Sequence, residues 1–151
     1  MDSQIPVTIV MIEDDEGHAR LIERNIRRAG INNSIQHFLS GRSALAFLYG
    51  EGEAEVRLEG PCLVLLDLNL PDMSGIDILK RLKNDNTHRR TPIVVLTTTD
   101  DKIEIQRCYD LGCNVYITKP VEYEAFANAI RQLGLFLSVI QVPEIEGAER
   151  A

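Results

Sequence analysis

Short apolar runs alternate with amphipathic stretches along most of this chain. Runs rich in aliphatic and β-branched residues predict five strands, at Val7–Ile12, Ser34–Leu39, Cys62–Leu66, Ile93–Leu96 and Val115–Ile117. After each run, apolar side chains recur every three or four residues, which is typical of a helix with one buried face. The pattern therefore predicts that strand and helix alternate five times.

The predicted helices begin at residues that suit a helix N-terminus. Asp15, Ser40, Ser74 and Asp100 stand where a side-chain oxygen can cap the first four helices, and Pro120 is tolerated in the first turn of the fifth. The buried stripes are predicted from helical spacing: Ala19, Ile22, Ile26 and Ala29 in the first helix, Ile78, Leu79 and Leu82 in the third, and Ile105, Cys108 and Tyr109 in the fourth.

Alternation of this kind predicts an α/β fold, a flavodoxin-like, doubly wound parallel sheet of five strands in the order 2-1-3-4-5 with five helices. The continuously apolar strands Cys62–Leu66 and Ile93–Leu96 should be central, and the alternating strand Ser34–Leu39 should lie at an edge. Ligands of such sheets bind at the carboxyl ends of the strands. The residues that follow each strand are therefore the first place to look for function.

Composition narrows the class of protein. The chain has 151 residues, enough for one domain, and a net charge of −7, which disfavours general binding to nucleic acids or to anionic membranes. No apolar run approaches the roughly 20 residues of a membrane span, and the N-terminus lacks the pattern of a secretory signal. The three cysteines lack metal-ligand spacing, so we expect free thiols and a cytoplasmic location.

Polar residues of matched chemistry follow four of the predicted strands. Glu13 and Asp14 follow the first, Asp67 the third, Thr97 the fourth and Lys119 the fifth. Clustered carboxylates repel one another unless a cation shares the site, and ligands that are all oxygen suit Mg²⁺. Lysine and threonine can bind the oxygens of a phosphoryl group, and an aspartate can accept that group covalently. The edge is thus predicted to carry out Mg²⁺-dependent phosphoryl transfer to Asp67.

Four segments together resemble the receiver domain of two-component response regulators: Glu13-Asp14, LLDLNLPDMSG, VVLTT and YITKP, within about residues 6–135. The resemblance implies that Asp67 is the phosphoacceptor, and that Glu13, Asp14, Asp67 and the main-chain carbonyl of Asn69 hold Mg²⁺. It implies a switch hydroxyl at Thr97, a phosphoryl-binding lysine at Lys119 and an aromatic switch residue at Tyr116. Glu13 stands where many receivers have aspartate, and its longer side chain should reach the metal through water.

A narrower resemblance suggests a pathway. The long loop Gly50–Gly60, the segments LTTTDD and CNVYITKPV, and the apolar C-terminal extension resemble small stand-alone receivers that serve phytochrome and bacteriophytochrome histidine kinases. It implies a response regulator, not an enzyme, that takes its phosphoryl group from a partner histidine kinase and signals through protein–protein contacts.

The end of the chain is predicted to be an extension of the receiver. We expect a receiver over residues 1–136, and an extension over 137–151 that is apolar, then polar, and too short for an output domain. The apolar surface of Leu135, Phe136, Val139 and Ile140 predicts a homodimer interface. The alternative is that this segment folds back on its own domain.

Two rival functions fit the predicted fold. A phosphatase of the haloacid dehalogenase type also uses a strand-end aspartate with Mg²⁺, but it needs a second aspartate where this chain has Asn69. A flavin-binding electron carrier needs a phosphate loop after the first strand, where the acidic residues from Glu13 onward would repel phosphate.

His18, His37 and His88 are predicted to lie at the surface or at an edge and to take no part in phosphohistidine chemistry.

Overall fold

Five parallel strands form a single sheet in the order β2-β1-β3-β4-β5. The computed structural model describes residues 6–52, 57–119 and 122–132. The elements are β1 (Thr8–Ile12), α1 (Glu16–Arg28), β2 (Ile35–Phe38), α2 (Gly41–Tyr49), β3 (Cys62–Asp67), α3 (Gly75–Lys83), β4 (Ile93–Thr97), α4 (Lys102–Asp110), β5 (Val115–Thr118) and α5 (Tyr123–Gln132). The predicted fold class and strand order are confirmed.

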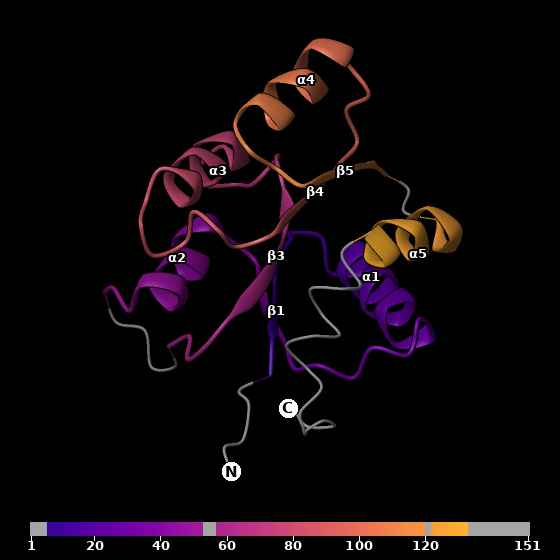
Figure 1. Ribbon diagram of the computed structural model, residues 1–151, viewed down its shortest axis with the longest axis horizontal. Helices are drawn as coiled ribbons and strands as arrows, with labels where there is room; N and C mark the ends of the chain where they lie inside the picture. Colours follow the sequence, from indigo (N-terminus) through magenta and orange to yellow (C-terminus); the bar gives the residue numbers. More distant parts are fainter. Residues whose placement is uncertain (1–5, 53–56, 120–121, 133–151) are drawn as a thin grey trace, which may run out of the picture.

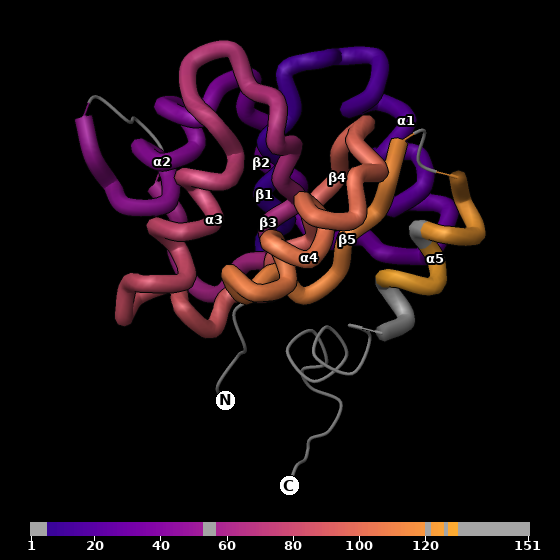
Figure 2. Tube along the Cα trace, turned by 90° about the horizontal axis from the view of Figure 1, so that it is seen from above, coloured from indigo at the N-terminus to yellow at the C-terminus, as the bar shows by residue number. Residues whose placement is uncertain are grey.

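Helices cover both faces of the sheet. Helices α1 and α5 lie on one side of the strands, and α2 and α3 lie on the other, with α4 beside β5 (Figure 1). The view from above shows the same division (Figure 2). The order of strands reverses between β1 and β3, so the topological switch point lies between these two strands, as the predicted strand order requires.

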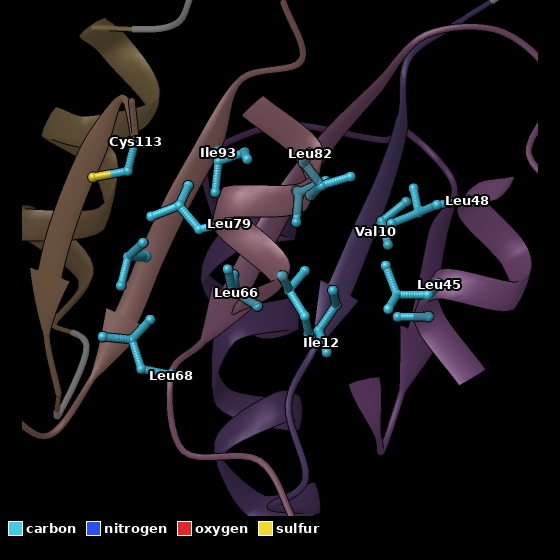
Figure 3. Packing of buried hydrophobic residues seen from close by; sticks show 14 of the residues in the cluster. Val10, Ile12, Leu45, Leu48, Leu66, Leu68, Leu79, Leu82, Ile93 and Cys113 are labelled. Carbon is cyan, nitrogen blue, oxygen red and sulfur yellow. The ribbon is translucent and has the colours of Figure 1, made fainter. Parts of the chain in front are cut away.

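Each face of the sheet has its own apolar core. On the side of α1 and α5, the cluster includes Ile9, Ile22, Ile26, Leu65 and Ala129. On the other side, side chains of α2 and α3 pack against β1, β3 and β4 (Figure 3); these include Leu45, Leu48, Ile12, Leu66, Leu79 and Leu82. Every residue of β3 and β4 is buried, as a parallel strand covered on both faces requires.

Strand register brings the predicted site residues to one edge. Asp67 at the end of β3 pairs with Leu96, the neighbour of Thr97 in β4. Thr97 in turn pairs with Thr118 of β5, and the amide of Lys119 donates to the Thr97 carbonyl at 2.7 Å. The strands are therefore aligned so that their last residues share a single rim.

Three of the four predicted caps are confirmed. The side chains of Asp15, Ser40 and Ser74 accept hydrogen bonds from amides in the first turns of α1, α2 and α3. The assignment of Asp100 to α4 was wrong, because the side chain of Asp101 accepts from the Ile103 amide. Both aspartates can cap a helix, and the path of the preceding loop decides which one does.

The predicted inward face of α4 is only partly correct. Cys108 is buried and Ile105 is half-buried, but Tyr109 is 43% exposed. Its hydroxyl accepts a hydrogen bond from the backbone amide of Tyr116 on the edge strand β5. The amide of an edge strand has no neighbouring strand to accept its hydrogen bond, and the Tyr109 hydroxyl accepts it instead. This contact explains why the Tyr109 side chain lies beside β5 and not in the core.

His88 is also placed differently from its prediction. It is 4% exposed, and its ring nitrogens contact the Leu48 carbonyl at 3.1 Å and the Thr91 hydroxyl at 3.3 Å. His37 is exposed on β2 and His18 is partly exposed on α1, as predicted. All three cysteines are buried free thiols, which fits their prediction.

Several predictions fall on residues outside the described ranges. These are Pro120 at the start of the fifth helix, part of the loop Gly50–Gly60, the domain boundary at residue 136, and the interface residues Leu135, Phe136, Val139 and Ile140. Within the described part of the chain, none of the helices has the length and apolar character needed to cross a bilayer.

Candidate functional site

Three carboxylates meet at the carboxyl edge of the sheet. Oxygen atoms of Glu13, Asp14 and Asp67 all lie within 4.8 Å of one another. Glu13 and Asp67 are buried, at 1% and 5% exposed, whereas Asp14 is exposed and opens the cluster to solvent. The sequence predicted this group, and the short connection from β1 to α1 positions two of its three members.

Lys119 reaches the same cluster from the end of β5. Its ammonium group donates to Glu13 Oε1 at 2.5 Å and to Asp67 Oδ2 at 3.2 Å, and its side chain is only 5% exposed. One positive charge thus faces three carboxylates. The excess of negative charge is what a divalent cation would neutralise.

Burial gives Glu13 an unusual environment for a carboxylate. Desolvation raises the pKa of Glu13, although its hydrogen bonds with Lys119 and with the Asp15 amide act in the opposite direction. Its second oxygen, Oε2, accepts from that amide at 3.1 Å. The longer side chain therefore places Glu13 against the lysine, a contact that the sequence did not predict.

The connection after β3, residues 68–74, forms a second wall of the site, and we call it the β3–α3 loop. The Asn69 amide donates to Asp67 Oδ1 at 3.1 Å, which fixes the carboxylate from the side opposite Lys119. Asn69 also pairs with Ser74, and the Gly75 amide closes the loop on the Leu68 carbonyl at 2.9 Å. A Cβ atom on Gly75 would lie 2.5 Å from the Asp67 carbonyl oxygen, so this close turn requires glycine.

Thr97 and Tyr116 lie on the third side of the site. Thr97 is fully buried, and its hydroxyl accepts from the Asn69 side-chain amide at 3.4 Å. Tyr116 is half-buried, and its hydroxyl donates to the Thr99 carbonyl at 2.9 Å. Thr97 therefore contacts Asn69, which is itself bonded to Asp67, and Tyr116 is bonded to the loop that follows Thr97.

The donor set fits a hard divalent cation. Glu13, Asp14 and Asp67 offer carboxylate oxygens, and no histidine or cysteine belongs to this cluster. A surface pocket lined by Asp14 and residues 68–74 adjoins the cluster at Asp14. Mg²⁺ prefers such ligands and keeps part of its water shell. An open, acidic pocket of this kind can hold the ion and still admit a phosphoryl group.

Two further residues belong to the site's surroundings and were not predicted. His18, in the first turn of α1, places Nδ1 3.3 Å from the Lys119 ammonium nitrogen. Asp72, in the β3–α3 loop, accepts hydrogen bonds from two amides of α2. Helical spacing after Asp15 could have placed His18 near the strand ends, but nothing in the sequence links Asp72 to residues 30 positions earlier.

The comparisons with known proteins agree with this geometry. The family model described as "Response regulator receiver domain" matches residues 9–131. The chain therefore belongs to the response regulator receiver domain family, a class of signalling domain. The resemblance inferred from the four sequence segments is confirmed.

The individual relatives are also response regulators or receiver domains. The chain is 70% identical to a receiver domain from Rhodospirillum rubrum of known structure, with a TM-score of 0.74 and coverage of 91% of this chain and 98% of that one. The bacteriophytochrome response regulator RtBRR is 33% identical, with a TM-score of 0.80 and coverage of 93% and 85%. The response regulator Rcp1 of Synechocystis is 35% identical over 118 residues, 78% of this chain and 80% of that protein. One Rcp1 structure is of its Mn²⁺-bound form.

Proposed function

We propose that this protein accepts a phosphoryl group from a partner histidine kinase onto Asp67 and thereby changes its contacts with other proteins. The observation that carries the proposal is the placement of Asp67, which is buried in a cluster of three carboxylates and bonded on one oxygen to Lys119 and on the other to the Asn69 backbone amide. Family membership supports it, because membership in the receiver domain family implies phosphotransfer from a kinase.

The residues suggest how the transfer would proceed. A carboxylate oxygen of Asp67 attacks the phosphorus of the kinase's phosphohistidine, so that a P–O bond forms while the P–N bond breaks. Lys119 lies within hydrogen-bond distance of the attacking carboxylate, and its charge can follow the phosphoryl oxygens as they arrive. Glu13, Asp14, Asp67 and the Asn69 carbonyl would hold Mg²⁺, which supplies further positive charge when bound.

Phosphorylation would then act on the Thr97–Tyr116 side of the site. The new group adds a charge of about −1.5 to −2 beside the Thr97 hydroxyl. Thr97 would turn toward it and release the side-chain amide of Asn69. Tyr116, which is bonded to the loop after Thr97, would change its position in response. The changed surface is the signal that a partner protein reads.

Replacement of Asp67 by asparagine tests the proposal. Asp67→Asn should abolish acid-labile phosphorylation by a phosphohistidine donor or by acetyl phosphate, whereas Asp77→Asn, an exposed aspartate of α3, should take up label at the wild-type rate. Labelling of Asp67→Asn at the wild-type rate would contradict the assignment of the phosphoacceptor.

The haloacid dehalogenase alternative makes an opposite prediction. Its acid/base position is occupied by Asn69, whose side chain is an amide that donates to Thr97 and cannot shuttle a proton as a carboxylate does. We therefore expect no sustained turnover of a generic aryl phosphate with Mg²⁺. Multiple turnovers per Asp67 would favour the phosphatase.

Likeness to the bacteriophytochrome response regulator RtBRR supports a phytochrome-type kinase as the donor. We infer that this protein acts in the cytoplasm, where its three unpaired thiols would stay reduced. A phosphotransfer screen against the histidine kinases of the same genome tests the pathway, and preferential transfer from a kinase without a chromophore domain would contradict it.

The proposed second partner is another copy of the chain. The apolar residues Leu135, Phe136, Val139 and Ile140 support a homodimer built from the fourth and fifth helices with the segment Leu137–Pro143. Sedimentation at tens of micromolar tests this contact. A monomer both with and without phosphorylation would rule it out.

A further inference from the structure

Asp72 joins the loop beside the phosphoacceptor to a different helix. Its Oδ1 accepts from the Gly41 amide at 2.9 Å, and its Oδ2 accepts from the Arg42 amide at 2.8 Å. These are amides of the first turn of α2, which have no partner within the helix. The carboxylate also places a negative charge at the positive end of the helix dipole.

The residue after Asp72 strengthens the same contact. A Cβ atom at Gly41 would lie 2.6 Å from Met73 Cγ, so the absence of a side chain on Gly41 lets Met73 pack directly on the helix. Gly41 is buried, and Met73 packs against the core on this side of the sheet. The β3–α3 loop is thus held at two adjacent points on α2, one polar and one apolar.

Asp72 lies within three residues of Asn69, a predicted metal ligand. Asn69 donates its amide to Asp67 and pairs with Ser74 across the loop, so the loop is a closed unit from the end of β3 to the start of α3. The same residues line a pocket that adjoins the carboxylate cluster at Asp14. A closed loop fixed at its tip cannot rotate freely about its base.

We propose that Asp72 is a positioning residue for the cation site. It holds the β3–α3 loop on the N-terminus of α2, and it thereby fixes the main chain of Asn69 in the orientation that the cation needs. This inference rests on the proposed function for the identity of the ligand. Asp72 itself contacts no carboxylate of the cluster, so its effect is exerted through the loop.

The first measurement needs no cation. Amide hydrogen exchange of residues 68–74 should become about tenfold faster in Asp72→Ala, because the loop opens without the α2 contact. Asp72→Asn keeps one oxygen acceptor and should show a smaller increase. It also provides a variant of nearly unchanged size if Asp72→Ala folds poorly.

The second measurement is binding of Mn²⁺, followed by the electron paramagnetic resonance signal of the free ion. We expect Asp72→Ala to raise the Kd about tenfold, within the range known for residues that orient metal ligands. Two controls should stay within about twofold of wild type in both measurements. Ser40→Ala removes α2's own cap, whose oxygen accepts from Ser43, and Asp77→Asn removes an exposed charge from α3.

Each outcome decides the inference. Unchanged loop exchange in Asp72→Ala would overturn it, because it would show that Asp72 does not hold the loop. An equal rise in Kd for Ser40→Ala would also overturn it, because the effect would then come from the stability of α2. Failure of wild type to bind Mn²⁺, or wild-type affinity in Asp67→Asn, would count against the proposed function instead. In that case loop exchange alone would still decide whether Asp72 holds the loop.

Discussion

The two loops that flank Asp67 are held in very different ways. The β3–α3 loop is bonded to α2 through Asp72, closed on itself at Asn69 and Ser74, and followed by a helix that buries Ile76, Ile78, Leu79 and Leu82. Residues 98–101, which we call the β4–α4 loop, lead into a helix that buries only Cys108 among its described residues. Ile103 on that helix is 80% exposed.

Under the proposed function, the two loops would have different roles. A cation site needs ligands held in place, and the well-packed loop carries the Asn69 carbonyl, the proposed main-chain ligand. A switch needs an element whose movement disrupts little packing, and the loosely held helix follows Thr97. Both properties follow from how many apolar side chains each helix buries.

The largest expected effect tests the packing of the two helices. Leu79 is fully buried on α3, and Leu79→Ala should lower the free energy of unfolding by about 3 kcal/mol. Ile105→Ala on α4 removes a half-buried side chain and should lower it by about 1 kcal/mol. Urea denaturation of both variants measures the two losses of unfolding free energy. Equal losses would show that α3 and α4 are packed equally well.

The second prediction concerns Glu13, whose side chain is buried against Lys119. The pKa of Glu13 is raised in the folded protein above its ordinary value of 4.5, so the folded state binds this proton first as the pH falls. Wild type should therefore gain stability relative to Glu13→Gln on acidification, from the folded pKa down to about the ordinary value. The gain is about 1.4 kcal/mol for each pH unit between the two pKa values.

Denaturation of both proteins at a series of pH values between 4 and 8, without divalent cations, measures this difference. If the difference in the free energy of unfolding between wild type and Glu13→Gln stays constant across this range, the pKa of Glu13 is not raised by folding. An opposite slope would show that the hydrogen bond from Lys119 outweighs burial.

A smaller effect is expected at the less tightly held loop. Tyr116→Phe removes the hydrogen bond to the Thr99 carbonyl and should lower stability by about 1 kcal/mol. Hydrogen exchange should rise in residues 98–101 and not in residues 68–74. Tyr109→Phe removes a hydroxyl that contacts β5, not this loop, and serves as the control. Faster exchange in both loops would mean that they are coupled more tightly than the packing indicates.

The smallest expected effect is at the surface of α4. Ile103→Ser should change the free energy of unfolding by less than about 0.5 kcal/mol, because the side chain is 80% exposed. Thermal or urea denaturation of the unphosphorylated protein gives the value. A loss above 1.5 kcal/mol would show that α4 is held by contacts of Ile103 that its exposure does not reveal.

Local patterns were sufficient for most of the fold and for the site's main residues. Strand hydrophobicity and the caps at Asp15, Ser40 and Ser74 depend on neighbours in the sequence, and strand-end polarity identified Asp67, Asp14 and Lys119. Parallel pairing then brings those residues together without further information, because all strands end at the same edge.

What could not be predicted depends on contacts distant in the sequence. Asp72 finds its partners only after α2 and the β3–α3 loop have packed together. His88 is buried because the turn after α3 brings it against the Leu48 carbonyl, 40 positions away. Tyr109 lies outward because an edge-strand amide needs its hydroxyl. Periodicity describes single elements, and each of these residues contacts a different one.

The three buried cysteines have a practical consequence for measuring movement in α4. Burial raises the pKa of Cys62 to about 11 and that of Cys113 to about 12, and it also raises that of Cys108. The thiolate is the form that reacts with maleimides, so the native thiols should be inert while the protein is folded. A cysteine introduced by Ile103→Cys would then be the preferred labelling position. A fluorophore or spin label there could follow the helix during phosphorylation while every native cysteine stays in place.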